Sequence, residues 1–172
     1  MIVAAAEVTH GFAADSPQFM GLLTQTARTM NVEEISANKA YATRKNMEGA
    51  GGLGVVPYIP FKRGTVAPQP ALDPADETVW TKMYYHFALR REEFLSSYHR
   101  RSNVESAFSM IKRKFGDAIR SKGEVAQVNE VLAKVLAHNL CVLIHCAHSL
   151  GIDPCFGATE APTELPVPVL VF

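Results

Sequence analysis

Four residues near the middle of the chain combine one carboxylate with two cations and a phenol at helical spacing. They are Tyr98, Arg101, Glu105 and Lys112. Intervals of three, four and seven residues place all four on one stripe of an α-helix. A carboxylate on such a stripe can bind a divalent cation, and the flanking cations can bind phosphate groups. The spacing alone fits a solvated helix face with intrahelical ion pairs equally well, and that arrangement is the commoner one.

The segment around these four residues is rich in basic side chains. Residues 90–122 include nine Lys or Arg and four Asp or Glu, although the formal net charge of the whole chain is zero. A local positive patch attracts phosphate even on a protein that is neutral overall. The charge distribution therefore favours contact with a nucleic-acid backbone, and the total charge says nothing about the partner.

The elements that must position the stripe follow from hydrophobic periodicity and from the placement of Gly and Pro. The expected strands are 2–9, 32–37 and 55–60, and the expected helices are 17–29, 42–48, 77–90, 93–115 and 125–150. The helix at 42–48 should stop at the Gly-rich segment 49–54, and the stripe should lie on one continuous helix, 93–115. This order predicts an α/β protein with a helical C-terminal section.

The four residues match, in type and spacing, the Tyr-x2-Arg-x3-Glu-x6-Lys signature of bacterial insertion-sequence DDE transposases. Other parts of the chain resemble the same family in the expected order, namely residues 13–19, 35–41, 57–62 and 137–140. The resemblance covers about residues 1–150. It is therefore not confined to one short motif.

The resemblance implies an RNase H-like fold in which two Asp and one Glu hold two divalent ions, Mg²⁺ or Mn²⁺. Such ions support phosphodiester cleavage and strand transfer. Glu105 would be the third acidic residue and a metal ligand, whereas Tyr98, Arg101 and Lys112 would contact DNA near the cleavage site. The implied partner is the DNA of the transposon ends. The same resemblance is compatible with a cytoplasmic protein that does not associate with membranes and that forms a homo-oligomer.

Two departures from the family pattern change the expected activity. Asn38 stands where the family has its second catalytic Asp, and an amide supplies an oxygen ligand without negative charge. The strand that carries the first Asp in the family lies upstream of the residues that match here. We therefore expect the chain to function in DNA transposition as the C-terminal part of a DDE transposase. We also expect its catalytic site to be incomplete. The alternative is a non-catalytic DNA-binding remnant.

The expected organisation is a partial catalytic domain, with a truncated RNase H-like sheet, followed by a tail. Its parts are a sheet-forming half at 1–62, a linker at 63–76, a helical half at 77–152 that carries Glu105, and a Pro-rich tail at 153–172. The last residues of that tail, 167–172, could form an edge strand or be the remnant of a truncated reading frame.

A series of His and Cys residues offers a different reading of the C-terminal half. His138, Cys141, His145 and His148 recur at spacings of three and four, which places them on one helical face. Side chains on one such face can bind a metal ion together, but His and Cys packed along an interior seam are the commoner arrangement. An unrelated helical protein with this seam, and without DNA affinity, is thus the second alternative.

Other sequence features exclude some classes of protein. Residues 49–54 fit G-x-G-x-x-G, but a helix before and a strand after reverse the order that a dinucleotide site requires. The apolar stretch 131–150 carries Lys, Asn and His, so we expect it not to span a bilayer. Three cysteines without a C-x-x-C pair fit a reducing compartment.

Overall fold

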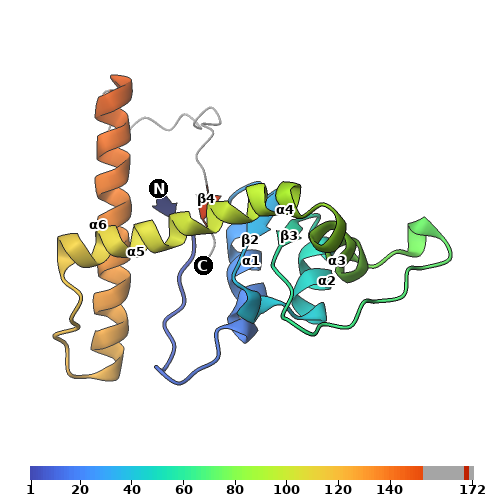
Figure 1. Cartoon of the computed structure of the whole chain (residues 1–172). Helices are drawn as coiled ribbons and strands as arrows, with labels where there is room; N and C mark the ends of the chain where they lie inside the picture. The colour runs from blue at the N-terminus through green and yellow to red at the C-terminus, as the bar shows by residue number, and fades with distance from the viewer. Residues whose placement is uncertain (153–168, 171–172) are drawn as a thin grey trace. The chain divides into compact units, whose positions relative to one another are not determined.

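The computed structural model describes residues 1–152 and a strand at 169–170, and it divides the chain into two compact units (Figure 1). The first unit combines Met1–Val8 with Asn103–Leu170, and the second is Thr9–Ser102. Within the described residues the protein is mixed α/β and mostly helical, with two short pairs of parallel strands. The expected α/β class with a helical C-terminal section is therefore confirmed at this level.

The second unit, Thr9–Ser102, surrounds a two-stranded parallel pair with helices. Its elements are η1 (Ser16–Gln18), α1 (Phe19–Ala27), β2 (Glu34–Ser36), η2 (Lys39–Tyr41), α2 (Arg44–Gly52), β3 (Val56–Tyr58), η3 (Pro74–Asp76), α3 (Val79–Leu89), α4 (Arg91–Tyr98) and η4 (His99–Arg101). β2 and β3 are parallel, with Ile35 opposite Pro57. Parallel strands need a crossover connection, and α2 supplies it.

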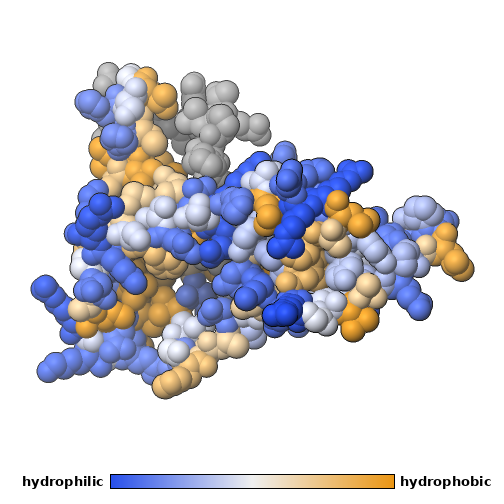
Figure 2. Space-filling model, viewed as in Figure 1, coloured by the Kyte–Doolittle hydropathy of each residue, from blue (hydrophilic) through white to orange (hydrophobic). Residues whose placement is uncertain are grey.

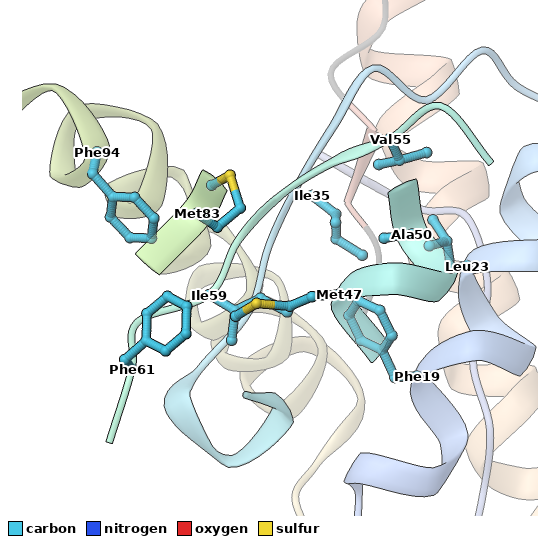
Figure 3. Close-up of a cluster of buried hydrophobic side chains, with 10 residues drawn as sticks. All are labelled: Phe19, Leu23, Ile35, Met47, Ala50, Val55, Ile59, Phe61, Met83 and Phe94. Atoms are coloured by element: carbon cyan, nitrogen blue, oxygen red, sulfur yellow. The ribbon is translucent and has the colours of Figure 1, made fainter. Parts of the chain in front are cut away.

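The core of this unit gathers side chains from every long element around the strand pair (Figure 3). Leu23, Met47, Ile59 and Phe94 are fully buried. Phe94 is surrounded by other rings, with its centroid 5.1 Å from that of Phe87. Burial of such large apolar side chains is the main force that stabilises a fold. The core therefore fixes the positions of the loops that follow β2 and β3.

The glycines at 49–52 belong to α2, so the prediction that they would end this helix was wrong. The reason is packing with the neighbouring helices, which the sequence pattern does not reveal. A Cβ atom at Gly49 would lie 2.6 Å from the Sδ of Met20, and one at Gly51 would overlap the Val79 side chain. The missing side chains let α1 and α3 approach α2 closely. This close packing offsets the low helix propensity of glycine.

The prediction of one continuous helix at 93–115 was also wrong. α4 ends at Tyr98, the 3₁₀ turn η4 follows, and α5 (Ser102–Phe115) begins after it. The Ser102 hydroxyl donates a hydrogen bond of 2.9 Å to the His99 carbonyl. A side-chain donor there competes with the backbone N–H groups for that carbonyl, which favours a tighter local turn.

The first unit contains β1 (Ile2–Val3), α5, α6 (Glu124–Leu150) and β4 (Val169–Leu170). β1 pairs in parallel with β4, Ile2 opposite Val169, so residues 169–170 form a strand, which was one of the two alternatives for 167–172. The remaining residues of the predicted tail lie outside the described residues. On α6, Asn139 accepts a hydrogen bond from the Val3 N–H at 2.8 Å and donates one to the Val3 carbonyl at 2.7 Å. The strand expected at 2–9 is thus reduced to two residues.

α6 is long and apolar enough, by length and composition alone, to cross a membrane. This finding does not contradict the expectation that the apolar stretch 131–150 does not span a bilayer. One such helix is weak evidence for a membrane protein, because helices of soluble proteins can meet the same criterion.

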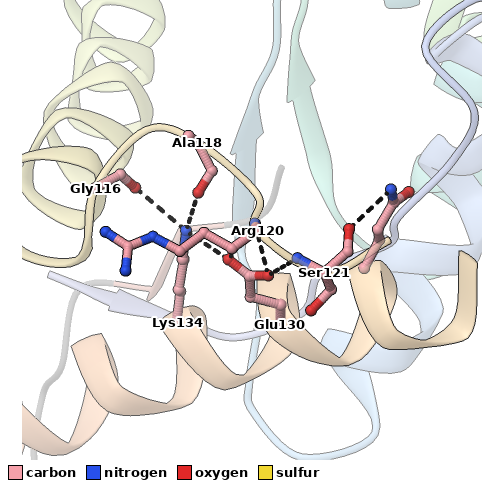
Figure 4. A network of polar contacts seen from close by, with 7 residues as sticks. Gly116, Ala118, Arg120, Ser121, Glu130 and Lys134 are labelled. Carbon is pink, nitrogen blue, oxygen red and sulfur yellow. Dashed lines mark hydrogen bonds and ion pairs between the residues drawn. The ribbon is translucent and has the colours of Figure 1, made fainter. Parts of the chain in front are cut away.

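A carboxylate organises the turn between α5 and α6 (Figure 4). Glu130 accepts hydrogen bonds from the Arg120 N–H at 3.0 Å and the Ser121 N–H at 2.9 Å. The Lys134 ammonium lies 3.2 Å from Glu130 and donates to the Ala118 carbonyl at 2.8 Å. These hydrogen bonds lower the pKa of Glu130 to about 2, and the bond from the Ser121 N–H has the largest effect.

This lowered pKa predicts a specific acid sensitivity for the first unit. The stabilisation from Glu130 is fully present above its ordinary pKa of about 4.5 and is lost as the pH falls towards 2. In Glu130→Gln, stability at pH 7 should be lower, and the additional loss between pH 4.5 and 2 should be smaller than in the wild type. Urea unfolding followed by far-UV circular dichroism measures both. Glu7→Gln removes an exposed carboxyl of the same unit, and an equal effect of this variant would contradict the assignment.

Candidate nucleic-acid interface

One pocket of the Thr9–Ser102 unit brings together residues from three distant parts of the sequence. It has a volume of about 800 Å³ and is lined by Asn38, Lys39, Ala40, Lys62, Arg63, Tyr98 and Arg101. Four of these residues carry a positive charge, and none is acidic. The pocket is therefore suited to an anion.

The first wall of the pocket follows the end of β2. Asn38 begins the 3₁₀ turn η2, and its side-chain carbonyl accepts a hydrogen bond of 2.7 Å from the Ala40 N–H. The turn is anchored in the core by Tyr41, whose ring centroid lies 5.8 Å from that of Phe19. The capping role fixes the orientation of the Asn38 side chain. The adjacent Lys39 is exposed at the pocket.

The second wall is a tight turn after β3. Phe61 is buried and packs edge-on against Trp80, with ring centroids 4.8 Å apart. The next two residues, Lys62 and Arg63, are exposed. The Thr65 N–H and hydroxyl donate to the Lys62 carbonyl at 3.1 and 2.8 Å, and Gly64 adopts a positive φ of 86°. Glycine suits this left-handed conformation, so the turn has a defined shape that presents both cations.

The third wall is the end of α4 with η4. The Ser36 hydroxyl donates to the Ser97 carbonyl at 2.9 Å, and Arg100 forms an ion pair of 2.9 Å with Glu34. Both contacts join β2 to this segment. They place Tyr98 and Arg101 beside the residues that follow β2, although the two segments lie about sixty positions apart in the sequence.

Within this wall, the Arg101 guanidinium stacks against the phenol ring of Tyr98. The guanidinium carbon lies 5.9 Å from the ring centroid. A cation over an aromatic face at this distance is weakly attracted by the ring. The two residues that matched the start of the signature therefore form one contact at the pocket.

The structure groups the residues predicted from the sequence into two sets. Asn38, Tyr98 and Arg101 line one pocket. Glu105 and Lys112 are exposed residues of α5 in the first unit, seven positions apart on the same side of that helix.

Four lining residues were missed as site residues: the cations Lys39, Lys62 and Arg63, and Ala40. Lys39 and Lys62 fall within segments that resemble the transposase family, but nothing in the local pattern singled them out. Their positions could have indicated a site, because Lys39 and Lys62 each follow the end of a predicted strand. The loops that follow neighbouring parallel strands lie at the same edge of a sheet.

The pocket does not fit the divalent ions that the family implies. Mg²⁺ and Mn²⁺ prefer carboxylate and other oxygen ligands, and here a single amide oxygen is surrounded by four cations. Among residues 1–152 and 169–170, no group of three or more His, Cys, Asp or Glu could hold a metal ion. The same finding applies to the His and Cys residues on α6, of which His138 donates a hydrogen bond of 3.1 Å from its Nε2 to the Met1 carbonyl.

The comparison with known protein families identifies the chain at the family level. The family described as transposase DDE domain matches residues 1–140. No match was found among curated proteins or among solved structures. Because the match covers most of the sequence, the chain belongs to the DDE transposase family.

Proposed function

We propose that this chain binds DNA through its backbone phosphates at the basic pocket and does not cleave it. The observation that carries this proposal is the position of Asn38 among Lys39, Lys62, Arg63 and Arg101. In the family, the residue at this position is an Asp that binds metal. With Asn in its place, the pocket keeps its cations and loses the negative charge that would attract a metal ion.

The chemistry of the pocket explains how such binding would work. Lys and Arg side chains neutralise phosphates and release the counterions that surround DNA, which makes affinity strongly dependent on salt. Arg63 and Arg101 can each bind a phosphate through two N–H groups, and Tyr98 offers a flat ring and a hydroxyl. These contacts read the backbone and carry little base specificity. The DNA class follows from the family, whose substrate is DNA.

We further propose that the chain is a partial RNase H-like domain of the insertion-sequence type. The parallel pair β2 and β3, linked through α2 and followed by helices, is compatible with the end of such a sheet. Tyr98, Arg101, Glu105 and Lys112 would be the residues of the signature. In this proposal Glu105 is the remaining acidic residue of the ancestral site, and Lys112 adds a phosphate contact.

The second candidate function is metal-dependent cleavage and strand transfer, which family membership favours. It requires Glu105 to bind Mg²⁺ or Mn²⁺ together with further oxygen ligands. One carboxylate is a weak basis for two hard cations, because ligand charge largely determines their affinity. For this reason we place it second.

The experiment that separates the two candidates is DNA binding against salt, together with a nicking assay on the same preparation. Fluorescence anisotropy with a labelled duplex should show affinity that falls steeply as NaCl rises. Supercoiled plasmid should stay intact with Mg²⁺ or Mn²⁺. Nicking that Glu105→Ala abolishes would establish the second candidate instead. Folded protein that does not bind DNA at low salt would eliminate both.

A further inference from the structure

The Asn38 side chain has a defined orientation at the basic pocket. Its Oδ1 atom accepts a hydrogen bond of 2.7 Å from the Ala40 N–H. Only the carbonyl oxygen of an amide can accept such a bond, so this contact distinguishes the oxygen from the nitrogen. The Nδ2 group therefore points away from the Ala40 N–H. Within the part of the chain that the structure describes, no hydrogen bond uses this group, which leaves two N–H donors at the pocket.

The surroundings of this amide are positively charged. Four cationic side chains line the same pocket, and none of its lining residues is acidic. The space-filling view shows that hydrophilic residues also predominate over α4, which leads into the third wall (Figure 2). Cations and N–H donors both bind phosphate oxygens. The lining therefore suits a phosphate group that also receives a hydrogen bond from the amide.

Capping of η2 does not by itself explain an amide at position 38. Asn and Asp are about equally favourable at a capping position, because the cap uses only one side-chain oxygen. The two residues differ at the other terminal atom, which is an N–H donor group in Asn and a second oxygen that shares the negative charge in Asp. With this atom the Asp of the family can bind a cation, whereas Asn38 can bind an anion.

We propose that Asn38 donates a hydrogen bond from Nδ2 to a phosphate oxygen that the cations of the pocket also bind, so that phosphate binds here without a divalent ion. The chain thus has a phosphate ligand at the position where the family has a metal ligand. The four cations supply the positive charge that a metal ion would otherwise supply. That this phosphate belongs to a DNA backbone rests on the proposed function.

Fluorescence anisotropy with a labelled duplex in EDTA tests the amide through two substitutions. Asn38→Ser keeps a capping oxygen and removes the amide donor. It should weaken DNA binding about tenfold, the effect typical of one hydrogen bond to a charged group, with an unchanged dependence on salt. Asn38→Asp keeps the cap but places a negative charge next to the phosphate, and it should weaken binding roughly a hundredfold. If Asn38 only capped η2, both variants would bind DNA as tightly as the wild type, because Ser and Asp cap as well as Asn.

Asn31→Asp is the matched control for the added charge. Asn31 is an exposed residue of the same unit that does not line this pocket. An exposed charge away from the bound phosphate is screened by salt, so this variant should weaken binding by no more than about twofold. A loss as large as that in Asn38→Asp would mean that any added negative charge opposes binding, and it would overturn the proposal.

A titration with inorganic phosphate tests the same contact without DNA. In nuclear magnetic resonance spectra of the isotope-labelled chain, the side-chain amide signals of Asn38 are identified by their loss in Asn38→Ser. They should shift with sodium phosphate and not with sodium chloride. Signals that do not respond to phosphate, or an Asn38→Ser variant that binds DNA as tightly as the wild type, would overturn the proposal. A wild type that fails to bind DNA while these signals still shift with phosphate would eliminate the proposed function and uphold the phosphate contact.

Discussion

Phe94→Ala should destabilise the Thr9–Ser102 unit by about 3–5 kcal/mol, the cost typical of removing a buried phenyl ring. The Phe94 side chain is fully buried, and its ring lies 5.4 Å from that of Tyr58 and 5.1 Å from that of Phe87. The cavity would open between α4, α3 and β3, where little can collapse to fill it. Domain stabilities are about 5–15 kcal/mol, so the variant would lose a large fraction of the total.

Trp80 makes this measurement specific to one unit, because it is the sole tryptophan of the chain and packs in the same core. Urea unfolding followed by its fluorescence should show the midpoint fall sharply in Phe94→Ala. Leu72→Ala is the matched control, since this side chain is fully exposed and its loss should change stability by less than about 0.5 kcal/mol. A loss below about 1 kcal/mol in Phe94→Ala would show that this core is more plastic than the structure implies.

Lys62→Ala/Arg63→Ala should weaken DNA binding by roughly a hundredfold at low salt. The estimate assigns about 1.5 kcal/mol, or a factor of roughly ten, to each charge-assisted contact with phosphate. Both side chains are exposed and only the Lys62 backbone carbonyl stabilises the turn, so folding should be preserved. The slope of log affinity against log salt should also decrease by about two, one for each contact.

Lys45→Ala/Lys82→Ala is the control for this prediction. It removes two exposed lysines of the same unit that do not line the pocket, so the net charge changes equally. Equal weakening by both double variants would mean that general positive charge, and not the pocket, binds DNA. Anisotropy titrations at several salt concentrations supply both the affinity and the slope.

The sequence predicted the elements well and their boundaries less well. The periodic apolar residues located every long helix, because periodicity reports directly on which face is buried. The prediction that the glycines would end α2 was wrong because Met20 and Val79 pack closely against Gly49 and Gly51. The local sequence pattern does not show this packing. The break at η4 was missed for a similar reason: a hydroxyl bond at Ser102 alters the turn without changing the hydrophobic pattern.

The candidate site was only partly predictable. Asn38, Tyr98 and Arg101 were singled out through the resemblance to transposases, and the structure brings them to one pocket. Lys62 and Arg63 lie more than thirty positions from Tyr98, and only the folded chain shows that they belong to the same surface. The proposed roles of Glu105 and Lys112 remain predictions.

The glycines of α2 also determine which sequences this fold can accept as it diverges. Gly49 and Gly51 face Met20 and Val79, so any side chain there demands a second change in a neighbouring helix. Gly52, one position further on, is the last residue of α2 and has open space around its Cα, so an alanine there would be favourable by about 0.5 kcal/mol. Related chains should therefore vary freely at position 52, while positions 49 and 51 change only together with positions 20 and 79.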